Sequence, residues 1–170
     1  MNYRIVGAIL VVLSSSAVGF SIVKGQKEEQ NSLLQLIRGL EFMACELEFR
    51  LPTLLELCVL TASQVSGPIR SFFVLLEEKL RNNASDDVYG CVYSTVKTMD
   101  QLPEVTRRNL LLLGKTLGRF DLSGQLSGIA SVIELCKRDL EGLQSNQDVR
   151  FRAYRTLGIC AGIALVILFM

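Results

Sequence analysis

The sequence contains no histidine and no tryptophan, and it has only three prolines in 170 residues. Histidine is the most frequent general base of enzymes and a common zinc ligand, so its absence removes the most frequent catalytic and metal-binding arrangements. The 18 Lys and Arg nearly balance the 17 Asp and Glu, and this balance predicts no basic stripe for a nucleic acid. We therefore expect a protein that is not an enzyme, with no catalytic residue, no metal site and no cofactor.

Charged residues are also missing from both ends of the chain. All 17 acidic residues and 17 of the 18 basic residues lie between Lys24 and Arg155, and the remaining base is Arg4. The 19 residues from 5 to 23 are uncharged, close to the ~20 residues that a helix needs to cross a bilayer. The first uncharged segment therefore predicts a transmembrane helix.

The second uncharged segment is shorter, with 15 residues after Arg155. Ala153 and Tyr154 extend it, because the guanidinium of Arg155 can snorkel to the lipid headgroups. We therefore predict a second transmembrane helix at the C-terminal end. The predicted segments are an external N-terminus (1–4), a transmembrane helix (5–23), a helical domain (24–152) and a second transmembrane helix (153–170).

Each uncharged segment has an alternative interpretation. Small residues from Ser14 to Ala17 could mark the cleavage site of a signal peptide. An uncleaved anchor is favoured because apolar residues resume after that site, at Val18 and Phe20. The C-terminal segment could instead be a hydrophobic helix that packs on a soluble core.

The cations beside the two predicted spans indicate an orientation. Lys24 and Lys27 follow the first span, and Arg150, Arg152 and Arg155 lie at the start of the second. Positive charge accumulates on the cytoplasmic side, so the helical domain is expected in the cytoplasm with both termini outside. Five cysteines without a CxxC pair agree with a reducing compartment.

The central segment has the apolar spacing of α-helices. A first helix carries apolar residues at alternating steps of 3 and 4, at Leu33, Ile37, Leu40, Ala44, Leu47 and Leu51. Further helices are predicted by their end signals. Pro52 suits the first turn of a second helix, and a third helix is predicted over 68–80. Ser85 is a predicted N-cap, Pro103 a predicted start, Gly118 a predicted end and Asp121 a further predicted N-cap. The fold predicted is an all-α antiparallel bundle of five or six helices flanked by the two transmembrane helices.

The last helix has the longest regular pattern. Its apolar residues again alternate in steps of 4 and 3, as in a heptad seam, at Leu122, Leu126, Ile129, Ile133, Cys136, Leu140 and Leu143. No proline occurs between Asp121 and Met170, so one helix can run from the domain into the second span. The simplest interpretation of this pattern is a packed bundle core.

Small residues four apart occur in both predicted spans. Gly158 and Gly162 share one face of the second span, and Ser15 and Gly19 share one face of the first. Such faces allow two helices to approach closely in lipid, so these four residues are predicted to pack membrane helices. Small residues are also common in membrane helices without such a role.

Three stretches together resemble the stage III sporulation protein AB family of endospore-forming bacteria. They are Leu113-Gly114-x-x-Leu117-Gly118-x-x-Asp121-x-x-x-Gln125, the segment from Tyr154-Arg155-Thr156-Leu157-Gly158 to Leu168, and the opening Ile5-Val6-Gly7-Ala8-Ile9-Leu10 with Gly19-Phe20. Glu46, Pro52 and Glu56 add to the match at the junction of the first two helices. The candidate partner interface consists of the motif residues Glu46, Pro52, Gly114, Gly118, Asp121 and Gln125.

The resemblance implies a scaffold or platform subunit of the transenvelope complex between mother cell and forespore, which is needed for endospore formation. The family is similar to the helical cytoplasmic domains of platform proteins in type II secretion and type IV pilus systems. Its implied partners are the mother-cell membrane, a cytoplasmic secretion-type ATPase and other subunits of the same complex, with a homo-oligomer as a further candidate. The alternative is a membrane receptor or signalling adaptor with a helical cytoplasmic domain.

Gly114 and Gly118 have two interpretations. Gly118 lies where a helix is expected to end, and glycine there allows a left-handed backbone without a Cβ clash. Gly114 lies four residues earlier, where a missing side chain lets a neighbouring helix approach. The structural interpretation is favoured, and the alternative is that both glycines form a docking surface.

Overall fold

The computed structural model describes residues 2–82, 85, 87–118 and 121–169, with side chains described for 25, 27–82, 85, 87–118 and 121–145, and it consists of helices joined by short turns and loops. The elements within these ranges are α1 (Asn2–Phe49), α2 (Leu54–Gln64), α3 (Gly67–Arg81), α4 (Val88–Thr98), α5 (Glu104–Thr116) and α6 (Leu122–Phe169). The described residues contain six helices and no strand, so the predicted all-α fold is confirmed.

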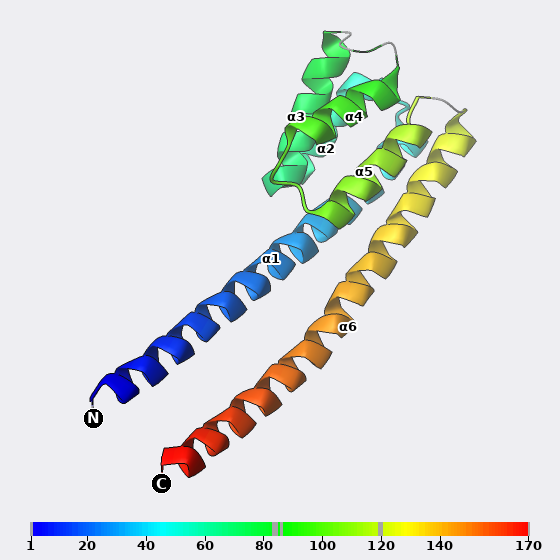
Figure 1. Cartoon of the computed structure of the whole chain (residues 1–170). Helices are drawn as coiled ribbons and strands as arrows, with labels where there is room; N and C mark the ends of the chain where they lie inside the picture. The colour runs from blue at the N-terminus through cyan, green and yellow to red at the C-terminus, as the bar shows by residue number, and fades with distance from the viewer. Residues whose placement is uncertain (1, 83–84, 86, 119–120, 170) are drawn as a thin grey trace.

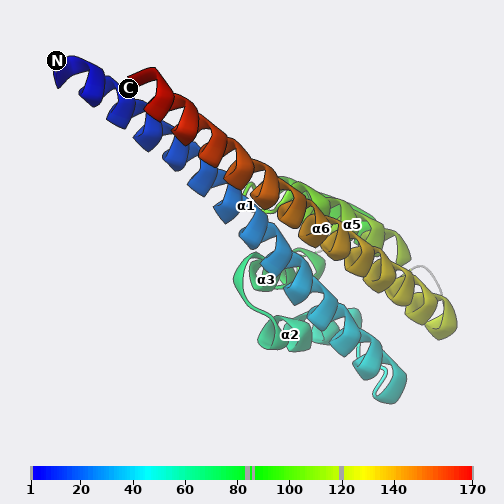
Figure 2. The ribbon, with the colours of Figure 1, turned by 90° about the horizontal axis from the view of Figure 1, so that it is seen from below.

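Successive helices alternate in direction, and the two long helices α1 and α6 lie side by side and antiparallel (Figures 1 and 2). α1 packs against α2, α3, α5 and α6, while α5 lies between α4 and α6. The chain therefore enters and leaves the bundle at one end. The corner between α1 and α2 and the turn between α5 and α6 lie together at the opposite end, which we call the tip.

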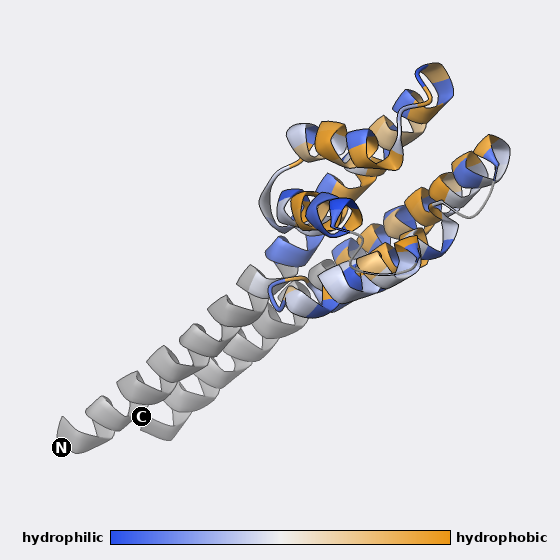
Figure 3. Cartoon of the chain, turned by 90° about the horizontal axis from the view of Figure 1, so that it is seen from above, coloured by the Kyte–Doolittle hydropathy of each residue, from blue (hydrophilic) through white to orange (hydrophobic). Residues whose placement is uncertain are grey.

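Apolar side chains from all six helices form one core. Figure 3 shows hydrophobic and hydrophilic residues alternating around the helices of the domain, as amphipathic helices require. The predicted seam of α1 is buried at Leu33, Leu40 and Leu47, and the seam of α6 is buried at Ile129 and Cys136. Both seams become exposed at the tip, where the pattern continues in sequence but no helix covers it.

Most predicted helix ends are confirmed. α5 begins directly after Pro103, and Gly118 follows its end with a φ of +73°. Asp121 caps α6, since its Oδ1 accepts a hydrogen bond of 3.0 Å from the Gly124 amide.

Two predicted helix starts are wrong by one or two residues. α2 is capped by Thr53, so Pro52 precedes the cap instead of occupying the first turn. α4 is capped by Asp87 and not by Ser85, because the Asp87 carboxylate accepts a hydrogen bond from the Gly90 amide. In both cases a neighbouring residue, Thr53 or Asp87, has the side chain that reaches the free amides of the first turn.

The predicted spans, 5–23 and 153–170, lie outside the residues whose side chains are described. The same holds for the predicted small-residue faces, Ser15 with Gly19 and Gly158 with Gly162. Across the described side chains, no helix has a stretch long and apolar enough to cross a membrane.

Candidate functional site

The turn between α5 and α6 forms one side of the tip. The Leu117 amide donates to the Leu113 carbonyl at 3.1 Å, which closes the last turn of α5. Gly118 then takes a left-handed backbone, which reverses the chain at little steric cost because glycine has no Cβ. Asp121 satisfies the first amides of α6, and the Gln125 amide donates to the Asp121 carbonyl at 2.9 Å.

The corner between α1 and α2 forms the other side of the tip. Thr53 and Glu56 form a capping box, in which the Thr53 hydroxyl accepts from the Glu56 amide and the Glu56 carboxylate accepts from the Thr53 amide. Leu51 has a φ of +50°, a left-handed backbone that costs a non-glycine residue about 1 kcal/mol or more. Strained backbone of this kind concentrates at functional sites, although tight corners also produce it.

A cleft of about 290 Å³ lies between these two sides, and we call it the tip cleft. Its lining comes from α1, the corner, α2, the turn and α6, and comprises Leu47, Leu51, Pro52, Leu54, Leu57, Gly118, Leu122 and Gln125. Pro52, Gly118 and Gln125 belong to the family resemblance, and Pro52 is more than sixty residues from the other two in sequence. The fold therefore brings separate motif residues to one surface.

The rim of the tip cleft exposes large apolar side chains. Leu51 is 64% exposed and Leu122 is 38% exposed, and the neighbouring Phe49 is 78% exposed. Apolar residues gathered at one end of a bundle are typical of a protein-binding surface, because burying them there gains free energy from the hydrophobic effect.

A second, more open groove of about 470 Å³ adjoins the tip cleft at Pro52. α2 lines it with Leu55 and Val59, both of which are exposed, and α3 lines it with Glu77 and Arg81, which form an ion pair. Two cations and two carboxylates line the groove, so its charge is balanced. It extends the apolar surface of the tip along α2.

Two of the motif residues, Glu46 and Gly114, do not line the tip cleft. The Glu46 carboxylate is 3.6 Å from the guanidinium of Arg50, which follows the end of α1. Gly114 is buried against α4, where a Cβ would lie 2.8 Å from Val92 Cγ1. A Cβ on Gly118 would lie 2.8 Å from Val88 Cγ2. Both glycines therefore make the close contacts that the structural interpretation expects, and Gly118 also lines the cleft.

The described side chains include no group of His, Cys, Asp or Glu that could hold a metal ion. Burial raises the pKa of the Cys58 thiol to about 12, helped by the charge of Glu77, and it raises the pKa of the Cys136 thiol to about 12 as well. Both thiols are therefore protonated at neutral pH and are poor nucleophiles. The tip cleft has shape and apolar lining but no arrangement for chemistry, which fits a binding surface.

Sequence reasoning did not single out Phe49, Leu51 or Leu122 as exposed. Leu51 and Leu122 continue the apolar seams of α1 and α6, and the pattern alone assigns them to the core. One signal was available, because both leucines stand beside a helix-ending or helix-capping residue, Pro52 and Asp121. Near a helix end the apolar seam can extend beyond the neighbouring helices, and its final residues are then exposed.

The fold and the tip together define an all-α helical-bundle protein with an apolar cleft at the end away from its termini. A family model described as stage III sporulation protein AB matches residues 4–170, so the chain belongs to that sporulation protein family. It is similar to stage III sporulation protein AB of Bacillus subtilis (strain 168), with 23% identity over 172 residues that cover 98% of this chain and 99% of the relative. A solved structure of stage III sporulation protein AB has a TM-score of 0.63 and 20% identity, covering 72% of this chain and 98% of the solved one, which shows the same fold.

Proposed function

We propose that the chain is a non-enzymatic scaffold subunit of the transenvelope, secretion-like complex between mother cell and forespore, and that its tip docks a cytoplasmic secretion-type ATPase and sister subunits. The observation that carries this proposal is the tip cleft. It joins Pro52 from one motif stretch with Gly118 and Gln125 from another, and exposed apolar residues surround it.

The physical properties of the tip suit a docking surface. Its two sides are held by the capping box at Thr53 and by the cap at Asp121, so little ordering entropy is lost when a partner binds. Partly exposed leucines and Phe49 supply apolar anchors of the kind that dominate the energy of protein interfaces. The capped corners keep these anchors in place.

The proposal includes a membrane position. Two terminal spans in the mother-cell membrane that faces the forespore would start from one end of the bundle, because α1 and α6 are antiparallel (Figure 1). The tip would then be the part of the domain farthest from the lipid, in the cytoplasm. The flanking cations Lys24, Lys27, Arg150, Arg152 and Arg155 support this orientation.

Cys45 tests the orientation, because it is an exposed native cysteine of α1. A membrane-impermeant maleimide should leave Cys45 unlabelled in intact cells and label it after permeabilisation. A Cys45→Ser variant identifies the signal as coming from this site. Strong labelling of Cys45 in intact cells would place the domain on the other side of the membrane.

Binding of the neighbouring ATPase tests the docking role. The full-length chain is purified in detergent and immobilised, and binding of the secretion-type ATPase encoded beside it is measured. Phe49→Ser and Leu122→Ser should each weaken binding by about tenfold or more, because each removes an apolar anchor from the tip. Thermal melting should stay unchanged, since both side chains are exposed.

Leu34→Ser is the matched control. Leu34 is 49% exposed and lies on α1, about 22 Å from Phe49 along the helix axis. Its loss should leave ATPase binding unchanged. Equal weakening by all three variants, or binding that survives both tip substitutions, would reject the tip as the docking surface, and an intact chain that fails to bind the ATPase would reject the proposed function.

A further inference from the structure

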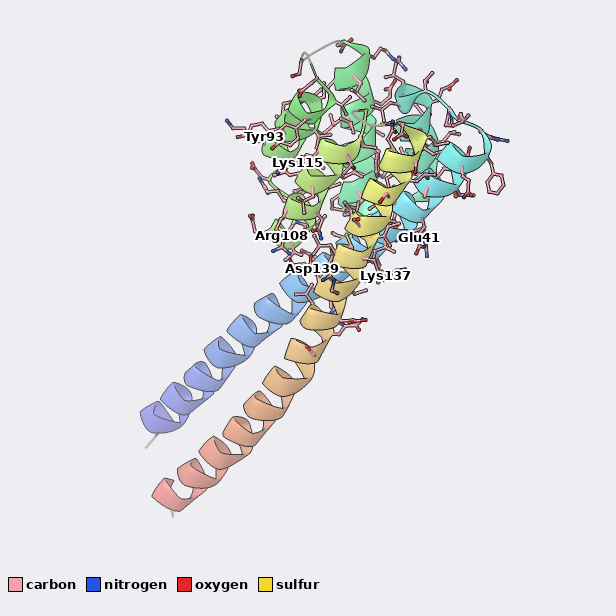
Figure 4. The ribbon with its side chains drawn as sticks, turned by 90° about the vertical axis from the view of Figure 1, so that its right-hand side faces the viewer. Glu41, Tyr93, Arg108, Lys115, Lys137 and Asp139 are labelled. Carbon is pink, nitrogen blue, oxygen red and sulfur yellow. The ribbon has the colours of Figure 1, made fainter. Side chains whose placement is uncertain are left out.

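A polar cluster joins α5 to α6. Arg108 donates two hydrogen bonds of 2.9 Å through Nη2, one to each carboxylate oxygen of Asp139. Asn109 donates a third through Nδ2 to Asp139 Oδ2, also at 2.9 Å. Figure 4 shows Arg108 and Asp139 meeting between the two helices. We call these three residues the α5–α6 node.

The node lies partly inside the core. Asn109 is fully buried and the Asp139 side chain is only 18% exposed, whereas the Arg108 side chain is 56% exposed and covers the carboxylate from the solvent side. Cys136, one turn before Asp139 on α6, is fully buried against it. The pKa of its thiol is raised mainly by burial and further by the Asp139 charge, while Asn109 and Arg108 act in the opposite direction.

The node is expected to stabilise the fold less than a well-packed apolar contact would. Asn109 Oδ1 is buried, and no described residue gives it a hydrogen bond. An unsatisfied buried acceptor loses its hydration without compensation. Buried polar groups of this kind do have one established use, which is to select one register of packed helices, since they find partners at only one relative position.

The apolar seam of α6 does not select a register by itself, and the steric contribution comes from Gly128, where a Cβ would lie 2.6 Å from Thr116 Cβ of α5. Leu126, Ile129, Ile133, Cys136 and Leu140 repeat at steps of 3 and 4. A slide by one helical turn, about 5.4 Å, again places apolar residues opposite apolar residues. The same slide would separate Asp139 from both Arg108 and Asn109.

We propose that the α5–α6 node is a register lock that holds α6 at one axial position against α5. The lock also sets the tip cleft, because Gly118 follows α5 while Leu122 and Gln125 belong to the first turns of α6. α6 continues as one helix to Phe169, so an axial displacement of its C-terminal part would be opposed at Asp139. This inference concerns the folded chain alone and does not depend on the ATPase.

Distances between spin labels on α5 and α6 test the lock directly. The full-length chain carries Lys115→Cys and Ser131→Cys as label sites, both at exposed positions, with Cys45→Ser and Cys160→Ser to remove other reactive sites. Pulsed electron paramagnetic resonance should give one narrow distance distribution. The Asn109→Leu/Asp139→Leu variant fills the same space without directional contacts, and it should add a second population at a distinct distance, as expected when α6 shifts along α5 by one helical turn of about 5.4 Å.

A folded double-leucine variant that keeps the single narrow distribution would overturn the proposal. Lys137→Ala is the matched control, because Lys137 lies two residues from Asp139 and pairs with Glu41 of α1 at 3.2 Å on the exposed surface (Figure 4). This control should keep the narrow distribution. Broadening by Lys137→Ala to the same extent would also contradict a lock that resides in the node.

Discussion

On the side that faces α4, α5 presents Gly114 and is followed by Gly118, whereas on the side that faces α6 it presents Arg108 and Asn109. Gly114 and Gly118 lie so close to Val92 and Val88 that a Cβ on either would come within 2.8 Å of a valine methyl. The α6 side also has a close contact, since a Cβ on Gly128 would lie 2.6 Å from Thr116 Cβ, and it adds three hydrogen bonds to Asp139. The helix is thus held by steric fit on both faces, and the α6 face adds directional polar contacts.

The two faces differ in what they specify. The glycine–valine contacts leave no room for a larger side chain. Because the contacting atoms are apolar, these contacts oppose added side-chain volume more strongly than a sliding of one helix along the other. The hydrogen bonds of the node form at only one alignment of α5 with α6. The node is less stabilising, however, because the buried Asn109 Oδ1 accepts no hydrogen bond from any described residue. α5 can therefore be fixed against α4 by shape, while its alignment with α6 depends on shape at Gly128 and on the polar contacts of the node.

The largest expected effect is on the glycine face. Gly114→Leu places a full side chain where a Cβ alone would already clash with Val92, and it should lower the free energy of unfolding by about 3 kcal/mol. Chemical denaturation of the full-length chain measures this loss. Val92→Ala in the same chain should recover part of it, and an absence of recovery would show that the clash lies elsewhere.

The next effect is on the node. Asp139→Ala removes the acceptor of three hydrogen bonds and should cost about 2 kcal/mol, because it leaves buried Asn109 without its partner. The Asn109→Leu/Asp139→Leu variant should cost less than Asp139→Ala, since both polar groups leave together. Additive losses in a double-mutant cycle would contradict this coupling.

A smaller effect is expected where the chain reverses after α5. Gly118→Ala should cost about 1 kcal/mol, since its φ of +73° is unfavourable for a residue with a Cβ. Gly118→Asn should cost less, because asparagine tolerates the left-handed region. If both variants also lose ATPase binding at unchanged thermal stability, the glycine acts as a docking residue instead.

The smallest effect is expected for the surface ion pair between α6 and α1. Lys137 and Glu41 are about half exposed, and pairs of this kind contribute little because water and salt screen them. Lys137→Ala should change the free energy of unfolding by less than about 0.5 kcal/mol. A loss as large as that of Asp139→Ala would remove the distinction between the surface pair and the node.

The sequence predicted the helices well because their signals are local. The seam of α6 from Ile129 to Cys136 is buried, and Gly118 and Asp121 end and begin helices as their residue types predict. The choice between neighbouring residues that could each cap the same helix was harder to predict. Ser85 and Asp87 are both good N-caps, and only the backbone shows which side chain reaches the free amides.

The polar contacts between helices were not predicted. Asp139 appears in the sequence as one of several charged residues on α6, and Asn109 as a residue within a leucine-rich helix. Their partners lie about thirty residues away, and no periodic pattern indicates which side chains meet. The exposed ends of the apolar seams, Leu51 and Leu122, were missed for the same reason, because exposure depends on which helix lies alongside.

The sequence by itself determined the helix content, most helix ends and the apolar faces, because these depend on residues within a few positions of one another. It also contained the motif residues on which the family resemblance rests. Only the tertiary structure decided that Pro52, Gly118 and Gln125 line one cleft and that Arg108 and Asn109 hold Asp139. Those contacts depend on the direction and register of helices far apart in the chain, which are set by packing the whole core at once.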